Sequence, residues 1–453
     1  MRVPRLEREV GMEVYVSQSP GINGRIRQFL EDFVVEEVLA NGAKAEARPA
    51  EIEPPKGCGR YLVCLLVKRD WDTLLAIREV AKHLGIGRER IQIAGMKDAK
   101  ALTAQHTTIS RITPEQISQV KIKDVVLRPL YYSSTKLSSK LLFGNQFHIS
   151  IRAIPHAPEV IKQRIEQVQS DLSKIGGLPN FFGHQRFGTI RPITHQVGKH
   201  LVKGDLEKAA LTFLAQPSLH EHPESREARQ QLQDTGDFRE ALRVFPRVLK
   251  YERLMLSHLA RQPRDFLGAL RRLPFKLRRL FVQAYQSFLF NRFLSERISR
   301  GISLAIAQRG DYVTKLDSHG LPTASFTRAT ARSLQSIQKA IDEDKMRIAI
   351  PLIGLEQNPS NGLQGEIEAG ILDAENLTPK NFKISCMHEI SARGGLRTAL
   401  TPIINPSIEE LSEDSANPSK QALKLGFMLQ RGSYATVLLR EFMKPQDLID
   451  AGF

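Results

Sequence analysis

Strand-like segments lie toward both ends of this 453-residue chain, and a long helical stretch rich in arginine separates them. Near the start, Phe33–Leu39 and Arg60–Val67 combine β-branched and apolar residues, as buried strands do. After Pro179 the pattern is mainly helical to about residue 300, then mixed, until strand-like character returns at Lys424–Leu429. A single core seldom grows beyond roughly 250 to 300 residues. We therefore predict an α/β (α+β) domain made from both ends of the chain, with a second domain inserted between them.

The charge of the chain indicates a polyanionic partner. Its 65 Lys and Arg residues outnumber 49 Asp and Glu residues, which gives a formal net charge of +16 and a pI near 9.8. Such an excess attracts phosphate backbones and makes binding depend steeply on salt. A generally basic proteome or an anionic membrane surface would also account for the charge, so the charge alone does not identify the partner.

The cysteines and the first residues of the chain argue against several classes of protein. Cys58, Cys64 and Cys386 form no CxxC pair and have no zinc-finger spacing, so we expect no structural zinc site and no disulfide framework. The segment Met1–Glu9 is charged and lacks an apolar signal core, and no run of about 18 apolar residues occurs. We expect a cytoplasmic protein with no membrane association.

A carboxylate lies at a predicted turn beside a sheet. The pattern predicts a helix over about Thr73–Leu84, a short strand at Ile91–Gly95 and a returning strand at about Thr103–Ser110. Lys97 and Asp98 fall in the turn between these strands, where side chains can face a cleft. Nearby cations would favour the ionised form of Asp98, which could act as a nucleophile or a base. Taken alone, however, an Asp in a lysine-rich turn is more often an ordinary turn residue.

Three further segments combine side chains suited to RNA. Asn145 and Phe147 lie on a predicted strand, where an aromatic ring and an amide could hold a base taken out of its stack. Pro179–Gly188 concentrates aromatic residues and glycines around Arg186, which could contact phosphate. Arg27 precedes the first strand and could pair with a carboxylate or a phosphate. Packing in a core or at a domain junction explains each segment about as well when it is considered separately.

Taken together and in order, these segments resemble the TruD family of tRNA pseudouridine synthases. The family pattern Ala-Gly-x-Lys-Asp-x-x-Ala-x-Thr-x-Gln is intact at Ala94–Gln105. Matching elements also occur at Ile26–Glu37, Lys136–Phe147, Asn180–Gly188, Tyr285–Asn291 and Arg431–Glu441. In the first of these, Leu30 replaces the usual proline and Arg27 replaces a lysine, which keeps the charge but changes the donor geometry.

The resemblance implies roles for particular residues. Asp98 would be the catalytic aspartate, with Phe147 stacking on the target uracil and Asn145 orienting Asp98. Arg27 would pair with Asp98 and keep it ionised. The further side chains that the resemblance assigns to substrate binding are Phe33, Lys97, Lys136, Gln185 and Arg186.

The resemblance also implies a fold and a reaction. The fold is a catalytic domain with a mixed, largely antiparallel sheet and flanking helices, formed by residues 1–179 and 403–453, with a TRUD domain inserted at 180–402. The reaction is conversion of uridine 13 of tRNA to pseudouridine by a monomer that needs no protein partner, metal or cofactor. Consistent with this, the sequence has no Walker loop and no zinc-deaminase ligand spacing. An RNA-binding or RNA-folding protein on the same scaffold is the alternative.

Overall fold

The computed structural model describes residues 3–48 and 53–453, and its largest element is a mixed eight-stranded sheet. Seven strands follow the order β13-β14-β6-β1-β4-β2-β5, and β3 pairs with β4 beside this path. Among the strand pairs of the described residues, only β1 and β4 run parallel, so the sheet is largely antiparallel, as predicted. The strands are β1 Phe33–Leu39, β2 Tyr61–Arg69, β3 Ile91–Ile93, β4 Leu102–Ser110, β5 Val125–Ser133, β6 Leu142–Ile154, β13 Ile403–Glu413 and β14 Gln421–Gln430.

Two of these strands show how the sequence pattern determines burial. Along β6, Phe147, Ile149 and Ile151 are buried and alternate with half-buried polar residues, as predicted for a strand with one face in the core. By contrast, β2 is buried on almost every residue because its two faces pack in different apolar clusters. One face meets helix α2 (Thr73–His83), and the other meets the segment around Ala45 and Ala47.

The helices beside the sheet begin and end largely where the sequence predicts. The Asp72 side chain caps α2 by accepting hydrogen bonds from the backbone N–H groups of Leu74 and Leu75. Helix α4 (Pro158–Lys174) covers part of the sheet, and a short helix, α3 (Pro114–Ser118), precedes β5. The segment after Tyr434, whose apolar pattern left strand and helix open, forms α14 (Ala435–Met443). Every residue of α14 is buried, and its polar side is buried too, because Arg440 pairs with Glu7 and Glu441.

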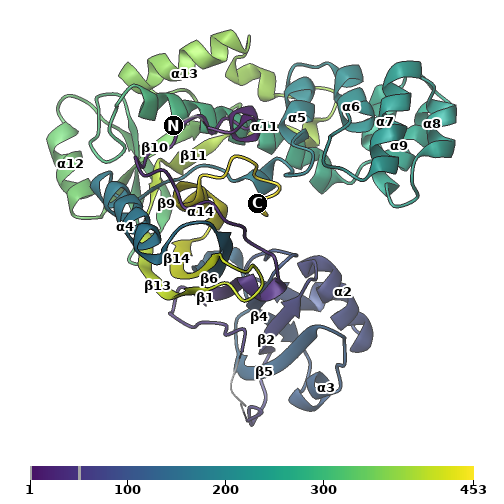
Figure 1. Ribbon diagram of the computed structural model, residues 1–453. Coiled ribbons are helices and arrows are strands. Elements are labelled where there is room, and N and C mark those ends of the chain that lie inside the picture. Colours follow the sequence, from purple (N-terminus) through teal and green to yellow (C-terminus); the bar gives the residue numbers. More distant parts are fainter. Residues whose placement is uncertain (1–2, 49–52) are drawn as a thin grey trace.

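The middle of the chain forms helices and a second sheet, which occupy the upper half of Figure 1. The four strands of this sheet follow the order β11-β10-β8-β9 and are β8 Tyr312–Leu316, β9 Pro322–Arg328, β10 Met346–Leu352 and β11 Gly395–Thr398. The helices are α5 Thr194–Val202, α6 Leu206–Ala215, α7 Pro223–Thr235, α8 Phe238–Val244, α9 Lys250–Leu259, α10 Phe266–Arg271, α11 Phe275–Ser299, α12 Leu334–Asp342 and α13 Gly362–Ala374. Among residues 3–48 and 53–453, no helix is both long and apolar enough to cross a bilayer.

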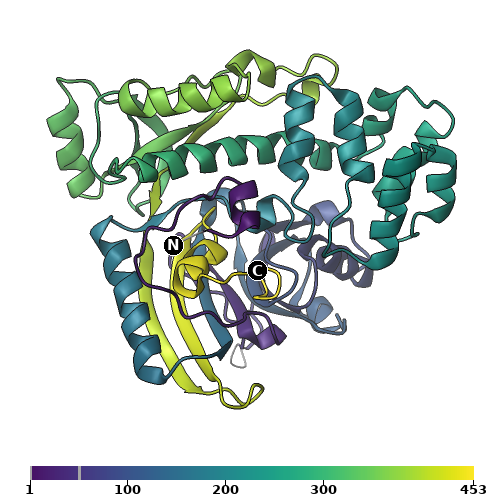
Figure 2. The same cartoon turned by 45° about the horizontal axis from the view of Figure 1, so that its top comes forward.

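The two halves of the molecule are joined by a short pair of strands. Strand β7 (Leu178–Pro179) pairs antiparallel with β12 (Leu400–Thr401), so the chain crosses between the halves at neighbouring points. The apolar core continues from one half into the other, since one cluster includes residues such as Ile149 and Phe290. Figure 2 shows α1 (Arg5–Glu9) lying between the large sheet and the helices of the middle segment. The boundaries at 179/180 and 402/403 themselves stay a prediction.

Candidate active site

The loop that carries Asp98 connects β3 to β4 and is held by polar side chains from neighbouring elements. The Gln105 amide on β4 donates to the carbonyl of Gly95 at 3.1 Å. The hydroxyl of Thr73, the first residue of α2, accepts from the Lys97 N–H at 3.1 Å and donates to the Lys97 carbonyl at 3.2 Å. These contacts fix the backbone on both sides of Met96, so the position of Asp98 is set by the sheet and by α2.

Lys68 is a contributor to this site that sequence reasoning missed. Its buried ammonium donates to the carbonyl of Asp98 at 2.6 Å and to the carbonyl of Trp71 at 2.7 Å. Burial lowers the pKa of Lys68 to about 8, although the nearby charges of Asp98 and Asp72 act in the opposite direction. The only signal in the sequence is a lysine near the end of an otherwise apolar strand, which alone does not indicate a function.

Arg27 faces Asp98, as the sequence predicts. Its Nη2 lies 3.6 Å from Oδ1 of Asp98, whose side chain is 35% exposed, whereas that of Arg27 is only 14% exposed. The guanidinium also stacks over the ring of Phe33, 4.0 Å from its centroid. Burial lowers the pKa of Arg27, and the charge of Asp98 opposes that effect. The result is an accessible carboxylate beside a cation that is largely shielded from water.

Lys97 lies next to Asp98 in the sequence but points beneath the loop. Its ammonium pairs with Glu37 at 2.7 Å, and both side chains are buried. The other carboxylate oxygen of Glu37 accepts from the backbone N–H of His106 at 2.9 Å. Burial would raise the pKa of Glu37, but the hydrogen bonds from His106 and the charge of Lys97 hold it below its ordinary value. Lys97 therefore anchors the loop in this conformation, and its contact with substrate stays a prediction.

Phe147 on β6 contacts Phe33, the ring that Arg27 covers. On neighbouring strands, Phe147 is the register partner of Val35, and Val35 is the register partner of Thr103. Thr103 in turn pairs with Lys68, whose ammonium binds the Asp98 carbonyl. The Phe147 ring is only 4% exposed, because it stacks on Phe427 at a centroid distance of 5.4 Å. It also meets Phe33 edge-on. Stacking of Phe147 on a uracil stays a prediction. It requires Phe33 and Phe427 to leave part of one face of the Phe147 ring open.

Asn145 lies one row further along the same face of the sheet. It is the register partner of Glu37 on β1, and so belongs to the group beneath the Asp98 loop. Its side-chain oxygen is buried and has no hydrogen-bond partner within residues 3–48 and 53–453, and no bond joins it to Asp98 there. A buried acceptor without a partner is costly, so a group that arrives with a substrate could satisfy it. The orienting role of Asn145 stays a prediction.

The remaining candidates lie apart from the contacts around Asp98. Gln185 accepts a hydrogen bond from the Thr436 hydroxyl at 3.1 Å, and Arg186 donates to the Ser287 hydroxyl at 3.2 Å. Lys136 is exposed on the segment between β5 and β6. Their contacts with substrate stay predictions.

A second arginine, missed by sequence reasoning, lies beside Arg186. The Arg397 guanidinium stacks on Phe182 with 4.1 Å to the centroid, and Arg186 lies 5.8 Å from the same ring. Arg397 also donates to the carbonyls of Asn180 and Gly432, each at 2.8 Å. Burial lowers its pKa to about 10. These contacts identify Arg397 as a residue that ties the two halves of the molecule together.

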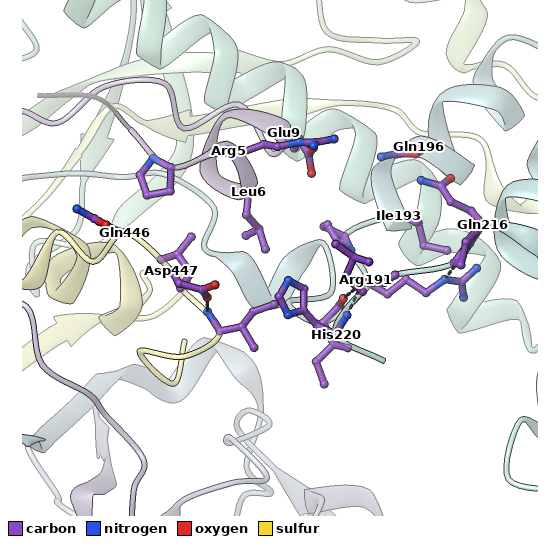
Figure 3. Close-up of a pocket in the computed structure, with 18 residues that line it drawn as sticks. Arg5, Leu6, Glu9, Arg191, Ile193, Gln196, Gln216, His220, Gln446 and Asp447 are labelled. Carbon is purple, nitrogen blue, oxygen red and sulfur yellow. Dashed lines mark hydrogen bonds and ion pairs between the residues drawn. The ribbon is translucent and has the colours of Figure 1, made fainter. Parts of the chain in front are cut away.

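A pocket of about 540 Å³ lies at the junction of four chain segments rather than at Asp98. Figure 3 shows residues of α1, of the 190–196 and 216–220 stretches and of the 446–449 segment around it, among them Gln196, Gln216 and His220. Asp98 does not line this pocket. The 446–449 segment nevertheless leads directly to Gly452, whose carbonyl contacts Arg27.

Comparisons with known proteins agree with this architecture. The profile of the family described as tRNA pseudouridine synthase D (TruD) matches residues 9–442. Proteins named "probable tRNA pseudouridine synthase D" from Methanosarcina barkeri and Methanosarcina acetivorans are each 40% identical to this chain over 449 residues, which cover 99% of both partners. A crystal structure of a "putative tRNA pseudouridine synthase D (TruD)" from Methanosarcina mazei superposes with a TM-score of 0.82 and 37% identity, covering 98% of this chain and 99% of that one.

The fold and the sequence therefore define a pseudouridine synthase scaffold. The chain belongs to the tRNA pseudouridine synthase D (TruD) family. This confirms the resemblance found in the sequence and the predicted fold class, a mixed, largely antiparallel sheet with flanking helices.

Proposed function

We propose that this protein converts uridine 13 of tRNA to pseudouridine, with Asp98 as the catalytic carboxylate and without a metal or cofactor. Membership of the TruD family supports isomerisation of uridine in tRNA in general. The observation that carries the catalytic assignment is the pairing of an accessible Asp98 carboxylate with the shielded guanidinium of Arg27, at 3.6 Å. The intact family pattern at Ala94–Gln105 contains that carboxylate.

The reaction breaks the bond between N1 of uracil and C1' of the ribose, turns the base and joins its C5 to C1'. The atoms balance within the substrate, because the C5 proton leaves and N1 gains one. Asp98 would either attack C1' or remove the C2' proton, and both routes need an ionised carboxylate. Phe147 and Asn145 would hold the detached uracil while it turns.

The loop contacts suggest how Asp98 keeps its position during the reaction. The Lys68 ammonium holds the Asp98 carbonyl, and Thr73 and Gln105 hold the preceding backbone. A catalytic group needs to stay within about 0.5 Å of its productive position, which rigid neighbouring elements provide. The side chain of Asp98 can then move against a fixed backbone as substrate enters.

The test uses tRNA tritiated at C5 of uridine, because pseudouridine formation releases that label. Asp98→Asn preserves the shape of the side chain but removes its charge, so we expect no label release above background and unchanged tRNA affinity. Glu115→Gln is the matched control, since it removes an exposed carboxylate on α3. A fully active Asp98→Asn protein would exclude the catalytic assignment.

Position 13 is tested with a tRNA transcript that carries cytidine at that position. We expect release of label to stop with this transcript, and sequencing of the product to show one modified site in the uridine-13 tRNA. Continued release would show that another uridine is the target.

The alternative function, an RNA-folding protein, predicts a different result. Asp98→Asn would complement a deletion strain and bind RNA, and no pseudouridine would form with either the wild-type or the variant protein.

A further inference from the structure

The segment Ala451–Phe453 packs directly against the backbone that carries Arg27. The Ile26 N–H donates to the carbonyl of Ala451 at 2.9 Å, and Nη1 of Arg27 donates to the carbonyl of Gly452 at 3.0 Å. Gly452 has φ of +86°, and a Cβ at this position would overlap the carbonyl oxygen of Ile26. The two backbones are thus in contact, and only glycine fits at position 452.

This segment is held in place without help from Arg27. The N–H groups of Ala451, Gly452 and Phe453 donate to the carbonyls of Asp447, Ile449 and Leu448 at 3.1, 3.0 and 2.9 Å. The Phe453 ring meets the buried His184 ring edge-on, with centroids 5.5 Å apart. Because the turn is closed by its own hydrogen bonds and anchored by an aromatic contact, it presents the Gly452 carbonyl as a fixed acceptor.

Arg27 depends on such an acceptor more than a lysine would. Its φ is +57°, which is unusual for a residue with a side chain, so its backbone has to be held by neighbouring structure. The guanidinium is planar, and fixing one edge determines where the other edge points. In this protein one edge binds Gly452, the face covers Phe33, and the remaining edge faces Asp98.

We propose that Gly452 is a positioning residue for the reaction: its carbonyl aims the Arg27 guanidinium at Asp98. This inference rests on the proposed function, because it assumes that the Arg27–Asp98 pair takes part in catalysis. Gly452 lies beyond residues 9–442, the part of the chain that the family profile matches. It is also separated from Arg27 by 425 positions, so only the folded chain connects them.

The test is Gly452→Ala, whose methyl group would push the segment away from Ile26 and Arg27. We expect kcat for tritium release to fall by roughly 10- to 100-fold, the cost of moving a catalytic group by about 1 Å, while KM and the Kd for tRNA stay unchanged. Gly236→Ala is the matched control: Gly236 also has a positive φ, of +66°, but nothing lies within 4 Å of a Cβ there. It should keep the wild-type kcat.

A double-mutant cycle separates positioning from general damage. If Gly452 acts through Arg27, then Arg27→Ala and Arg27→Ala/Gly452→Ala have the same kcat, because the second change has nothing left to disturb. Losses in kcat that multiply in the double variant would overturn the inference, as would a Gly452→Ala protein that matches Gly236→Ala.

Two further variants keep the outcome interpretable. If Gly452→Ala does not fold, as judged by its thermal unfolding, Phe453→Ala removes the aromatic anchor of the segment on His184 without adding a methyl group at position 452, and should also lower kcat. An unchanged kcat in Phe453→Ala would overturn the inference. Asp98→Asn is assayed in parallel, since its full activity would refute the proposed function itself, whereas its inactivity beside an active Gly452→Ala would refute only the role of Gly452.

Discussion

At the scale of single residues, buried charged side chains hold the loop that carries Asp98. Lys68 holds its backbone, and the Lys97–Glu37 pair supports the loop from below. A charge removed from water is costly unless it is paired and hydrogen-bonded. Lys68, Lys97 and Glu37 therefore hold the loop that carries Asp98 through buried, paired charges, and their substitution should affect activity and stability differently.

Lys68→Met should lower activity more than it lowers tRNA binding. The methionine fills a similar space but cannot hold the Asp98 carbonyl, so the loop loses one of its fixed points. We expect kcat to fall by about 10-fold or more, since small displacements of a catalytic group are expensive, with little change in the Kd for tRNA. Single-turnover assays and filter binding measure the two quantities. An unchanged kcat would show that the loop does not need Lys68.

The pKa of Lys68 also predicts a pH dependence. Its folded-state value of about 8 lies below the ordinary 10.5, so the folded protein releases this proton first as pH rises. The free energy of unfolding contributed by this group should therefore rise between about pH 8 and 10.5, where the unfolded chain still holds the proton. In the same range kcat should fall as the charge beside Asp98 disappears. Urea unfolding and kcat at pH 7.5 and 9.5 test both, and Lys68→Met should show neither change.

Breaking the buried Lys97–Glu37 pair should destabilise the protein strongly. Glu37→Gln leaves the Lys97 ammonium buried without its counter-charge, which costs about 3 to 5 kcal/mol. The double variant Glu37→Gln/Lys97→Met removes both charges, keeps an oxygen that can accept from the His106 N–H, and should recover much of that loss. Urea denaturation at neutral pH measures the difference. Equal stability of Glu37→Gln and wild type would mean that water or another group compensates the lysine.

At the scale of secondary-structure elements, the close contact between β6 and β14 positions Asn145. Gly144 on β6 lies opposite Gln430, and a Cβ there would overlap the carbonyl oxygen of Leu429. Leu429 is itself the register partner of Asn145. Gly144 thus allows β6 and β14 to approach closely next to Asn145, whose side-chain amide is predicted to bind uracil.

Gly144→Ala should push these strands apart. Overpacking of this kind costs about 1 to 3 kcal/mol, and we expect a corresponding loss of stability together with a reduced kcat. Gly370→Ala is the control, because Gly370 lies in α13 with nothing within 4 Å of a Cβ. That change should raise stability by about 0.5 to 1 kcal/mol. Thermal unfolding distinguishes the two, and a neutral Gly144→Ala would contradict the close contact.

At the scale of the whole molecule, the net charge of +16 should govern how the protein binds RNA. Counterion release makes the logarithm of affinity fall linearly with the logarithm of salt concentration. We predict a loss in tRNA affinity of roughly 10³- to 10⁵-fold between about 50 and 200 mM salt. This is the loss expected for a protein that makes about six to ten contacts with phosphates. Fluorescence anisotropy with the Asp98→Asn protein measures binding without turnover. A flat response would contradict an electrostatic interface.

The sequence by itself determined the elements around the site and its central pair. Local periodicity predicts β1, α2 and the β3–β4 turn because it reports burial within one element, and the ordered motifs predict that Arg27 pairs with Asp98, which lies 3.6 Å away. The sequence pattern missed β5 and did not decide whether the α14 segment forms a strand or a helix. A half-buried edge strand and an all-buried helix carry weak or ambiguous patterns.

Only the tertiary structure decided what surrounds that pair. The contacts of Asp98 with Lys68, of Lys97 with Glu37 and of Arg27 with Gly452 join residues 30, 60 and 425 positions apart. No local pattern encodes such contacts, because they follow from strand order and register. The sequence therefore placed a carboxylate beside a cation, and the folded chain determined that Lys97 supports the loop from beneath, that Lys68 holds it, and that Gly452 contacts Arg27.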